Sequence, residues 1–84
     1  MVGELLYYGR EECPLCEELL AGLLPWASRH ALAVEIRDVD ADPDSRRRYG
    51  HKVPVVLVDG LVACAGHLDL AELERLLRPD ASAR

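Results

Sequence analysis

The sequence predicts an α/β protein with a four-stranded mixed sheet, helices on both faces of the sheet, and the element order β-α-β-α-β-β-α. Short apolar runs alternate along the chain with segments whose apolar residues recur at helical spacing. The first two predicted strands are separated by a helix, which is the connection that parallel strands need. An Asp-Gly dipeptide between the last two apolar runs indicates a hairpin, which adds two antiparallel strands to the sheet.

The first strand and the first helix are predicted from the N-terminal third of the chain. Residues 5–8 are an apolar run with two tyrosines, closed by Gly9, which suits a buried strand. Pro14 suits the first turn of a helix, where its missing N–H would have had no partner. The apolar positions that follow have helical spacing: Leu15, Leu19, Leu20, Leu23, Leu24, Trp26 and Ala27. Pro25 breaks the hydrogen-bond ladder, so we expect a kink or a helix end within residues 24–30.

A second strand and a short helix are predicted next. Apolar and charged residues alternate over residues 34–37, which predicts a strand that runs to about residue 39. Residues 40–44 are rich in aspartate and contain a proline, which predicts a turn. The polar segment 45–49 then predicts a short helix that ends at Gly50.

The hairpin and the last helix complete the sheet and its cover. Residues 55–58 are β-branched or apolar and residues 61–64 form the return strand, so the Asp59-Gly60 dipeptide between them predicts a type I′ turn. In the last helix Asp69 is the expected N-cap, with a glutamate three residues later as in a capping box. This helix is expected to run to about Arg78, where Pro79 follows.

The length of the chain sets the domain organisation. A chain of 84 residues buries about 60 to 65% of its unfolded surface, which is enough for one thin core. We therefore expect a single domain over residues 1–79. The segment 80–84 has nothing apolar to bury beyond two alanines, so we expect a frayed tail there.

Composition and charge exclude several classes of function. The net charge of −5 disfavours nucleic acid as a partner, because a polyanion would meet a surface of the same sign. The longest uncharged stretch, residues 19–28, is too short to span a membrane and contains Gly22 and Pro25. The N-terminus lacks the basic start and the apolar block of an export signal, so we expect a cytoplasmic protein. We also expect the protein to be a monomer. Three cysteines in a reducing compartment point to chemistry rather than to structural disulfides.

The motif that carries chemistry is Cys13-Pro14-Leu15-Cys16, at the junction of the first strand and the first helix. Unpaired N–H groups and the positive end of the helix dipole favour a thiolate at a helix N-terminus. The spacing places both sulfurs on one side of the helix, one turn apart. Because a thiolate is the nucleophile in disulfide exchange, the motif predicts a thiol–disulfide oxidoreductase with Cys13 as nucleophile and Cys16 as resolving thiol.

An alternative from another class uses the same cysteines. Residues 64–67 have the form C-x-x-H, so Cys13, Cys16, Cys64 and His67 formally make a Cys₃His zinc set. The protein would then be a non-catalytic zinc-binding or protein-docking module. On the residues alone this alternative stays open.

The motif also carries a family resemblance. Cys13-Pro14-Leu15-Cys16 after a tyrosine-ending strand, together with Val53-Pro54-Val55 before the Asp-Gly hairpin, resembles the glutaredoxins of the thioredoxin superfamily. The resemblance covers residues 4–77 and is nearest to the short bacterial glutaredoxin-like proteins. It implies the thioredoxin/glutaredoxin fold and a cis peptide before Pro54, where the backbone of Val53 would bind an extended substrate. Without the resemblance a cis X-Pro bond has a chance of only about 5–6%, so an ordinary trans proline stays open.

The resemblance also implies partners and a substrate site, and the sequence departs from it at two points. It implies no bound cofactor, a protein or low-molecular-weight disulfide as substrate, and electrons from glutathione or a thioredoxin-reductase-type donor. Leu15 replaces the usual tyrosine of the family, and Ala65-Gly66 replaces its Gly-Gly pair, so both departures count against glutathione as substrate more than against the redox pair. The expected substrate-binding residues are Arg10, Pro14, Leu15, Val53, Pro54 and Gly66.

Acidic residues surround the cysteine motif. Glu11 and Glu12 precede it and Glu17 and Glu18 follow it. Like charges repel, and glutathione is itself an anion. We therefore expect these carboxylates to favour a protein or a less acidic thiol as substrate.

Overall fold

A computed structural model describes residues 4–77 and contains the predicted elements in the predicted order. The elements are β1 (Glu4–Gly9), α1 (Pro14–Arg29), β2 (Ala33–Asp38), the short 3₁₀ helix η1 (Val39–Ala41), α2 (Pro43–Tyr49), β3 (Val55–Val58), β4 (Leu61–Ala65) and α3 (Leu70–Leu77). They confirm the β-α-β-α-β-β-α order. The expected end of the last helix at Arg78 and the expected frayed tail 80–84 lie outside the described residues.

The sheet has the strand order β2-β1-β3-β4 and is mixed. β1 and β2 are parallel, as the intervening α1 requires, and Tyr7 lies beside Ile36. β3 is antiparallel to β1, with Val56 opposite Tyr7, and the hairpin adds β4 at the edge. β3 is thus a central strand, which explains why all four of its residues are apolar and buried.

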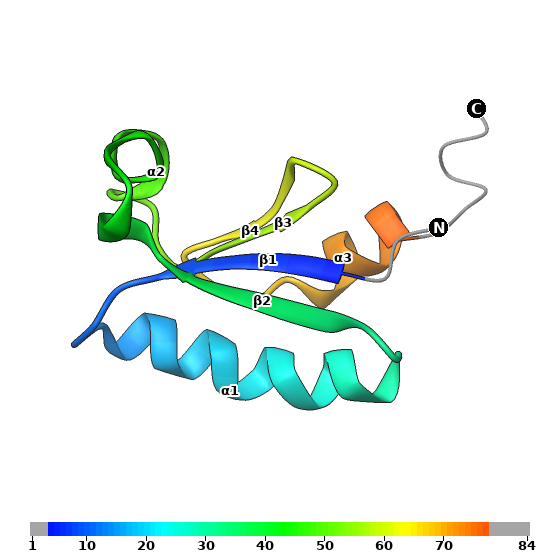
Figure 1. Cartoon of the computed structure of the whole chain (residues 1–84). Coiled ribbons are helices and arrows are strands. Elements are labelled where there is room, and N and C mark those ends of the chain that lie inside the picture. The colour runs from blue at the N-terminus through cyan, green and yellow to red at the C-terminus, as the bar shows by residue number, and fades with distance from the viewer. Residues whose placement is uncertain (1–3, 78–84) are drawn as a thin grey trace.

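The core lies between the sheet and two helices on one face. α1 contributes Cys16, Leu19, Leu23, Trp26 and Ala27, and α3 contributes Leu73 to the same buried cluster. α2 lies on the opposite face, at the end of the sheet where β1 leads into α1 (Figure 1). There Tyr8 stacks on Tyr49 with the ring centroids 5.1 Å apart. The sheet therefore has helices on both faces, which confirms the predicted architecture.

α1 ends within its predicted range and contains Pro25. A kink or a helix end was expected within residues 24–30; α1 continues past Pro25 and ends at Arg29, inside this range. Pro25 is exposed, whereas Trp26 and Ala27 are buried against the sheet. Burial of these two side chains holds the last turn in place although the proline provides no N–H to the ladder.

The segment after β2 is more regular than predicted. The expected turn 40–44 is replaced by η1 and by the start of α2 at Pro43, so this helix begins two residues earlier than expected. Buried Ser45 explains the change, because its hydroxyl donates to the carbonyl of Val39 at 2.8 Å and to that of Asp42 at 3.0 Å. These bonds join η1 to α2.

The hairpin turn is confirmed in detail. Asp59 has φ of 52° and Gly60 has φ of 81°, so both central residues adopt the left-handed conformation of a type I′ turn.

Within residues 4–77, no helix combines the length and the apolar character that crossing a membrane would require.

Asp69 caps α3 as predicted, and its removal should be measurable. The N–H of Glu72 donates to the Asp69 side chain at 3.1 Å. We expect Asp69→Ala to lower the free energy of unfolding by about 0.5–2 kcal/mol, because one N–H at the helix start loses its acceptor. Chemical denaturation gives this quantity. Asp69→Asn keeps an acceptor oxygen, so its free energy of unfolding should fall much less. Equal losses of stability in the two variants would contradict a capping role.

Candidate functional site

Cys13 and Cys16 lie at disulfide distance at the start of α1, with their Cα atoms 5.2 Å apart. Cys13 is the N-cap residue, with an extended backbone, and its sulfur accepts a hydrogen bond from the N–H of Cys16 at 3.2 Å. A sulfur thus takes the place that a serine or aspartate oxygen usually fills at a helix start. This position favours the thiolate, because the first N–H groups of a helix have no partners within the helix.

The two sulfurs differ in access to solvent. Cys13 is partly exposed, whereas Cys16 is only 2% exposed and belongs to the core cluster. The hydroxyl of buried Tyr7 donates to the Cys16 carbonyl at 3.1 Å, which fixes the turn that carries the second cysteine. Burial, with a smaller effect from the charge of Glu17, raises the pKa of Tyr7, so the phenol remains a donor at neutral pH. A molecule arriving from solvent meets Cys13 first.

The segment Val53-Pro54 lies beside the end of β1. Its peptide bond is cis, as the family resemblance implied. Tyr8 is paired with Val55, so the antiparallel register carries Pro54 next to the end of β1, from which the chain continues to Cys13. The N–H of Gly66 donates to the Pro54 carbonyl at 2.8 Å. The structure therefore brings two of the expected substrate-binding residues and Gly66 to one place.

Gly66 has a conformational reason to be glycine. Its φ is 86°, in the left-handed region that residues with a Cβ avoid. Ala65, by contrast, is the last residue of β4 and pairs with Val55. The single glycine of the Ala65-Gly66 pair thus stands where the backbone turns away from the sheet.

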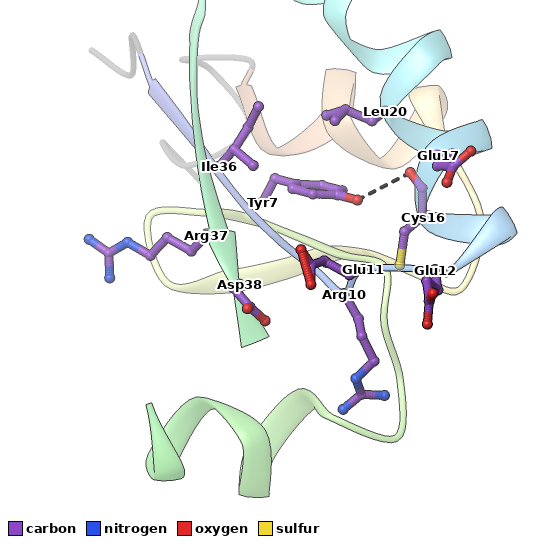
Figure 2. A pocket seen from close by; sticks show the side chains of 11 residues that line it. Tyr7, Arg10, Glu11, Glu12, Cys16, Glu17, Leu20, Ile36, Arg37 and Asp38 are labelled. Carbon is purple, nitrogen blue, oxygen red and sulfur yellow. Dashed lines mark hydrogen bonds between the residues drawn. The ribbon is translucent and has the colours of Figure 1, made fainter. Parts of the chain in front are cut away.

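Arg10 makes contacts that its sequence position did not reveal. Its Nε and Nη2 donate to the Asp40 carboxylate at 2.7 Å and 3.0 Å, and its Nη1 donates to the Gly50 carbonyl at 3.0 Å. The hydrogen bonds between the two side chains raise the pKa of Arg10 and lower the pKa of Asp40. Figure 2 shows the guanidinium directed away from Cys16. Arg10 therefore ties the loop before Cys13 to η1 and to the end of α2, and its expected role in substrate binding stays a prediction.

Pro14 and Leu15 are both exposed between the two cysteines. The Leu15 side chain is 55% exposed, although it is apolar and lies one residue from a buried cysteine. An exposed leucine at this point offers an apolar contact to a molecule that reaches Cys13.

A cleft beside Cys16 was not anticipated from the sequence. It has a volume of about 700 Å³ and lies between α1, the loop that precedes it, and the ends of β1 and β2 (Figure 2). Its lining includes Tyr7, Leu20, Ile36 and Asp38, which sequence reasoning did not assign to a site. Only the parallel register of β1 and β2, which sets Tyr7 beside Ile36, brings these side chains together. No local pattern in the sequence signals that pairing.

The formal zinc set does not gather in the structure. Cys64 is buried in β4, and its sulfur accepts from the Asp69 N–H at 3.4 Å. Among residues 4–77, no group of three or more histidine, cysteine, aspartate or glutamate side chains is close enough to hold a metal ion. His67 is exposed and forms no such group with the cysteines.

Metal analysis of the purified protein tests the zinc alternative directly. We expect well under one zinc per chain and an unchanged melting temperature in chelator. A structural zinc site would instead contribute folding free energy, and its removal would unfold so small a domain. A stoichiometric zinc content would contradict this expectation.

The buried Cys64 thiol should be inert in the folded protein. Burial raises its pKa, and the thiolate is the reactive form. We expect iodoacetamide to alkylate Cys13 of the reduced, folded protein at neutral pH and to reach Cys64 only after unfolding, as peptide mapping would show. Alkylation of Cys64 at the same rate as Cys13 would contradict this.

The raised pKa of Cys64 also makes the stability of the protein depend on pH. Above about pH 8.5 the unfolded thiol loses a proton that the folded thiol keeps, so the free energy of unfolding should fall as the pH rises through that range. The oxidised protein is the right sample, because Cys64 is then its only free cysteine. Cys64→Ala is the control, and its free energy of unfolding should fall less steeply over the same pH range.

Comparisons with known proteins agree with this geometry. The chain matches the family of the glutaredoxin-like domain (DUF836) over residues 4–78. It is similar to the solution NMR structure of protein Ne2328 from Nitrosomonas europaea, with a TM-score of 0.78 and 30% identity over 89% of this chain and 91% of that chain. The thioredoxin-like protein BC3987 gives a TM-score of 0.57 and 27% identity over 87% and 99% of the two chains.

A more distant likeness shows the fold alone. Thioredoxin 1 from Thermosipho africanus has a TM-score of 0.63 at 19% identity, with 96% of this chain and 99% of that chain covered. No curated protein is significantly similar to the chain. The match over residues 4–78 and the four-stranded fold together show that this chain belongs to the glutaredoxin-like domain family, within the thioredoxin superfamily.

Proposed function

We propose that the protein is a thiol–disulfide oxidoreductase in which Cys13 is the nucleophile and Cys16 the resolving thiol. The observation that carries this proposal is the unequal exposure of two cysteines at disulfide distance at a helix start. A partly exposed sulfur can reach a substrate, and a buried sulfur one turn away can then displace it. Membership of the glutaredoxin-like family supports the same chemistry.

The reaction consists of two exchanges. The Cys13 thiolate attacks one sulfur of a substrate disulfide, forms a mixed disulfide with it and releases the other half as a thiolate. Cys16 then gives up its proton to solvent and attacks the Cys13 sulfur, which forms the Cys13–Cys16 disulfide and releases the second half of the substrate. The dithiol loses two electrons and the substrate gains them. A thiol reductant returns two electrons to the protein and closes the cycle.

The proposal extends to the substrate and the electron donor. The substrate is a protein or low-molecular-weight disulfide that lies along Val53 and Pro54 and contacts exposed Leu15. The donor is glutathione or a thioredoxin-reductase-type protein. We place the protein in the cytoplasm, where thiol reductants keep such a pair reduced. We further propose that it is a monomer without a bound cofactor.

A coupled reduction assay tests the function and identifies the donor. The oxidised protein is offered glutathione with glutathione reductase in one arm and a thioredoxin reductase in the other, and NADPH consumption is followed with a model disulfide substrate. We expect turnover in at least one arm, above the rate without the protein. Failure in both arms, together with failure of the chemically reduced protein to reduce any disulfide, would overturn the proposed function.

A further inference from the structure

The cleft beside Cys16 has the chemistry of a substrate subsite. We infer that it receives a basic residue, lysine or arginine, which lies next to the cysteine of a disulfide substrate. This inference rests on the proposed function and adds a substrate class to it, namely protein disulfides with a positively charged neighbouring side chain. Three features of the cleft carry it: its charge, its apolar floor and its position relative to the reactive sulfur.

The charge of the cleft is negative after the internal ion pairs are considered. Four carboxylates line it, from Glu11, Glu12, Glu17 and Asp38, and none of them forms an ion pair within residues 4–77. Asp38 accepts one backbone hydrogen bond, from the N–H of Asp40 at 2.9 Å. A cation that enters the cleft therefore finds carboxylates without a partner side chain.

The two arginines of the lining do not offset this charge. Arg10 is paired with Asp40 at 2.7 Å and Arg37 with Glu35 at 2.6 Å, and neither carboxylate lines the cleft. Asp38 makes a small contribution to the raised pKa of Arg10, whose main cause is the hydrogen bond to Asp40, and forms no ion pair with it. Figure 2 shows both guanidinium groups directed away from the middle of the cleft.

The floor of the cleft is apolar and incompletely covered. The Tyr7 ring, Leu20 and Ile36 lie together at one end, with Asp38, Glu11 and Glu12 at the other (Figure 2). The Ile36 side chain is 55% exposed, although it is in a strand of the sheet. Lysine and arginine suit both parts, because their methylene stems pack on apolar surface while the charged head meets the carboxylates. An acidic or short polar side chain suits neither part.

The cleft adjoins the cysteine pair on the side of Cys16. Cys16 lines it, and Glu12, another lining residue, directly precedes Cys13. In this inference, the residue beside the substrate cysteine that is joined to Cys13 enters the cleft past Glu12. Glutathione, which has two carboxylates and one ammonium group, would meet repulsion there.

A pair of symmetric peptide disulfides tests the inference. The two peptides are identical except that arginine or glutamate flanks the cysteine, and each forms a disulfide with itself, so either sulfur gives the same product. The chemically reduced protein is mixed with each peptide in a single turnover, and the released thiol is measured after an acid quench. This design needs no electron donor. We expect the arginine peptide to react at least about 10 times faster, the lower end of electrostatic steering.

Charge variants test whether the preference for the arginine peptide comes from the carboxylates of the cleft. Glu17→Gln removes one carboxylate of the cleft and should lower the arginine-to-glutamate rate ratio by about 1.5- to 5-fold. Glu74→Gln removes one exposed carboxylate of α3, outside the cleft, and is the matched control that should leave the ratio unchanged. Raising the salt concentration to about 0.5 M should also reduce the ratio through screening. The ratio cancels any change in the intrinsic reactivity of Cys13.

The outcomes separate the inference from the proposed function. A ratio near one in the parent protein overturns the inference while the reductase function stands. A ratio that falls equally in Glu17→Gln and Glu74→Gln also overturns it, because the preference then comes from the overall net charge of −5 rather than from the cleft. If neither peptide is reduced, the proposed function itself fails.

Discussion

Cys16→Ser is expected to stop the protein after its first exchange and to accumulate a mixed disulfide between Cys13 and the substrate. The partly exposed sulfur can still attack, but no thiol remains one turn away to displace the bound half of the substrate. Cys13→Ser is expected to lose disulfide reduction down to the rate of buffer alone, because the remaining sulfur of the pair is only 2% exposed. Intact-mass spectrometry after incubation with a peptide disulfide would show the adduct in the first variant and none in the second.

Cys64→Ser is the matched control for these two variants. Cys64 is also a cysteine but is buried in β4, and its sulfur hydrogen-bonds to the backbone of Asp69. This variant should keep the reductase rate per folded molecule and form the Cys13–Cys16 disulfide after mild oxidation. An adduct on Cys64, or full activity in Cys13→Ser, would show that the roles of the cysteines are assigned wrongly.

Leu23→Ala is expected to have the largest effect on stability. Leu23 is fully buried in α1 and belongs to the cluster that joins this helix to the sheet and to α3. Truncating such a leucine removes apolar burial and leaves a cavity, at a cost of about 2–5 kcal/mol. The whole fold of 84 residues has a free energy of unfolding of roughly 4–13 kcal/mol at 0.05–0.15 kcal/mol per residue. A single substitution should therefore remove a large fraction of the stability.

The adjacent residue supplies the control. Leu24 is on the same helix but is 42% exposed, so Leu24→Ala makes the same chemical change where little burial is lost. We expect Leu24→Ala to change the free energy of unfolding by no more than about 0.5–1 kcal/mol, since exposed positions contribute little to stability. Urea denaturation of both variants, analysed with the same dependence of the unfolding free energy on urea concentration, gives the two losses of stability. Equal losses at the two positions would mean that α1 does not pack on the sheet through Leu23.

Features with a local physical cause could be predicted from the sequence. The type I′ turn at Asp59-Gly60 depends on residues that tolerate positive φ, and the Asp69 cap depends on an oxygen three residues before an unpaired N–H. The cysteine pair is local too, because its spacing of one helical turn is set within four residues. The order of strands and helices, and the candidate nucleophile, followed from patterns of this kind.

Features that join distant segments were decided by the tertiary structure. Arg10 meets Asp40 across thirty residues, and the cleft exists because the parallel register sets Tyr7 beside Ile36. Pro25 stays within a helix because Trp26 and Ala27 are buried. The Arg10–Asp40 and Tyr7–Ile36 contacts join residues that no periodicity or motif connects, and the burial that holds Trp26 and Ala27 comes from the sheet.

The sequence alone therefore determined the order of the strands and helices and the position of the Cys13–Cys16 pair at a helix start, since turns, caps and a one-turn cysteine spacing depend on neighbours along the chain. The tertiary structure decided which sulfur is buried, where Arg10 is anchored and which carboxylates line the cleft. These properties depend on how β1, β2, α1 and η1 pack against one another, because the burial of Cys16 and the Arg10–Asp40 ion pair join segments that are distant along the chain.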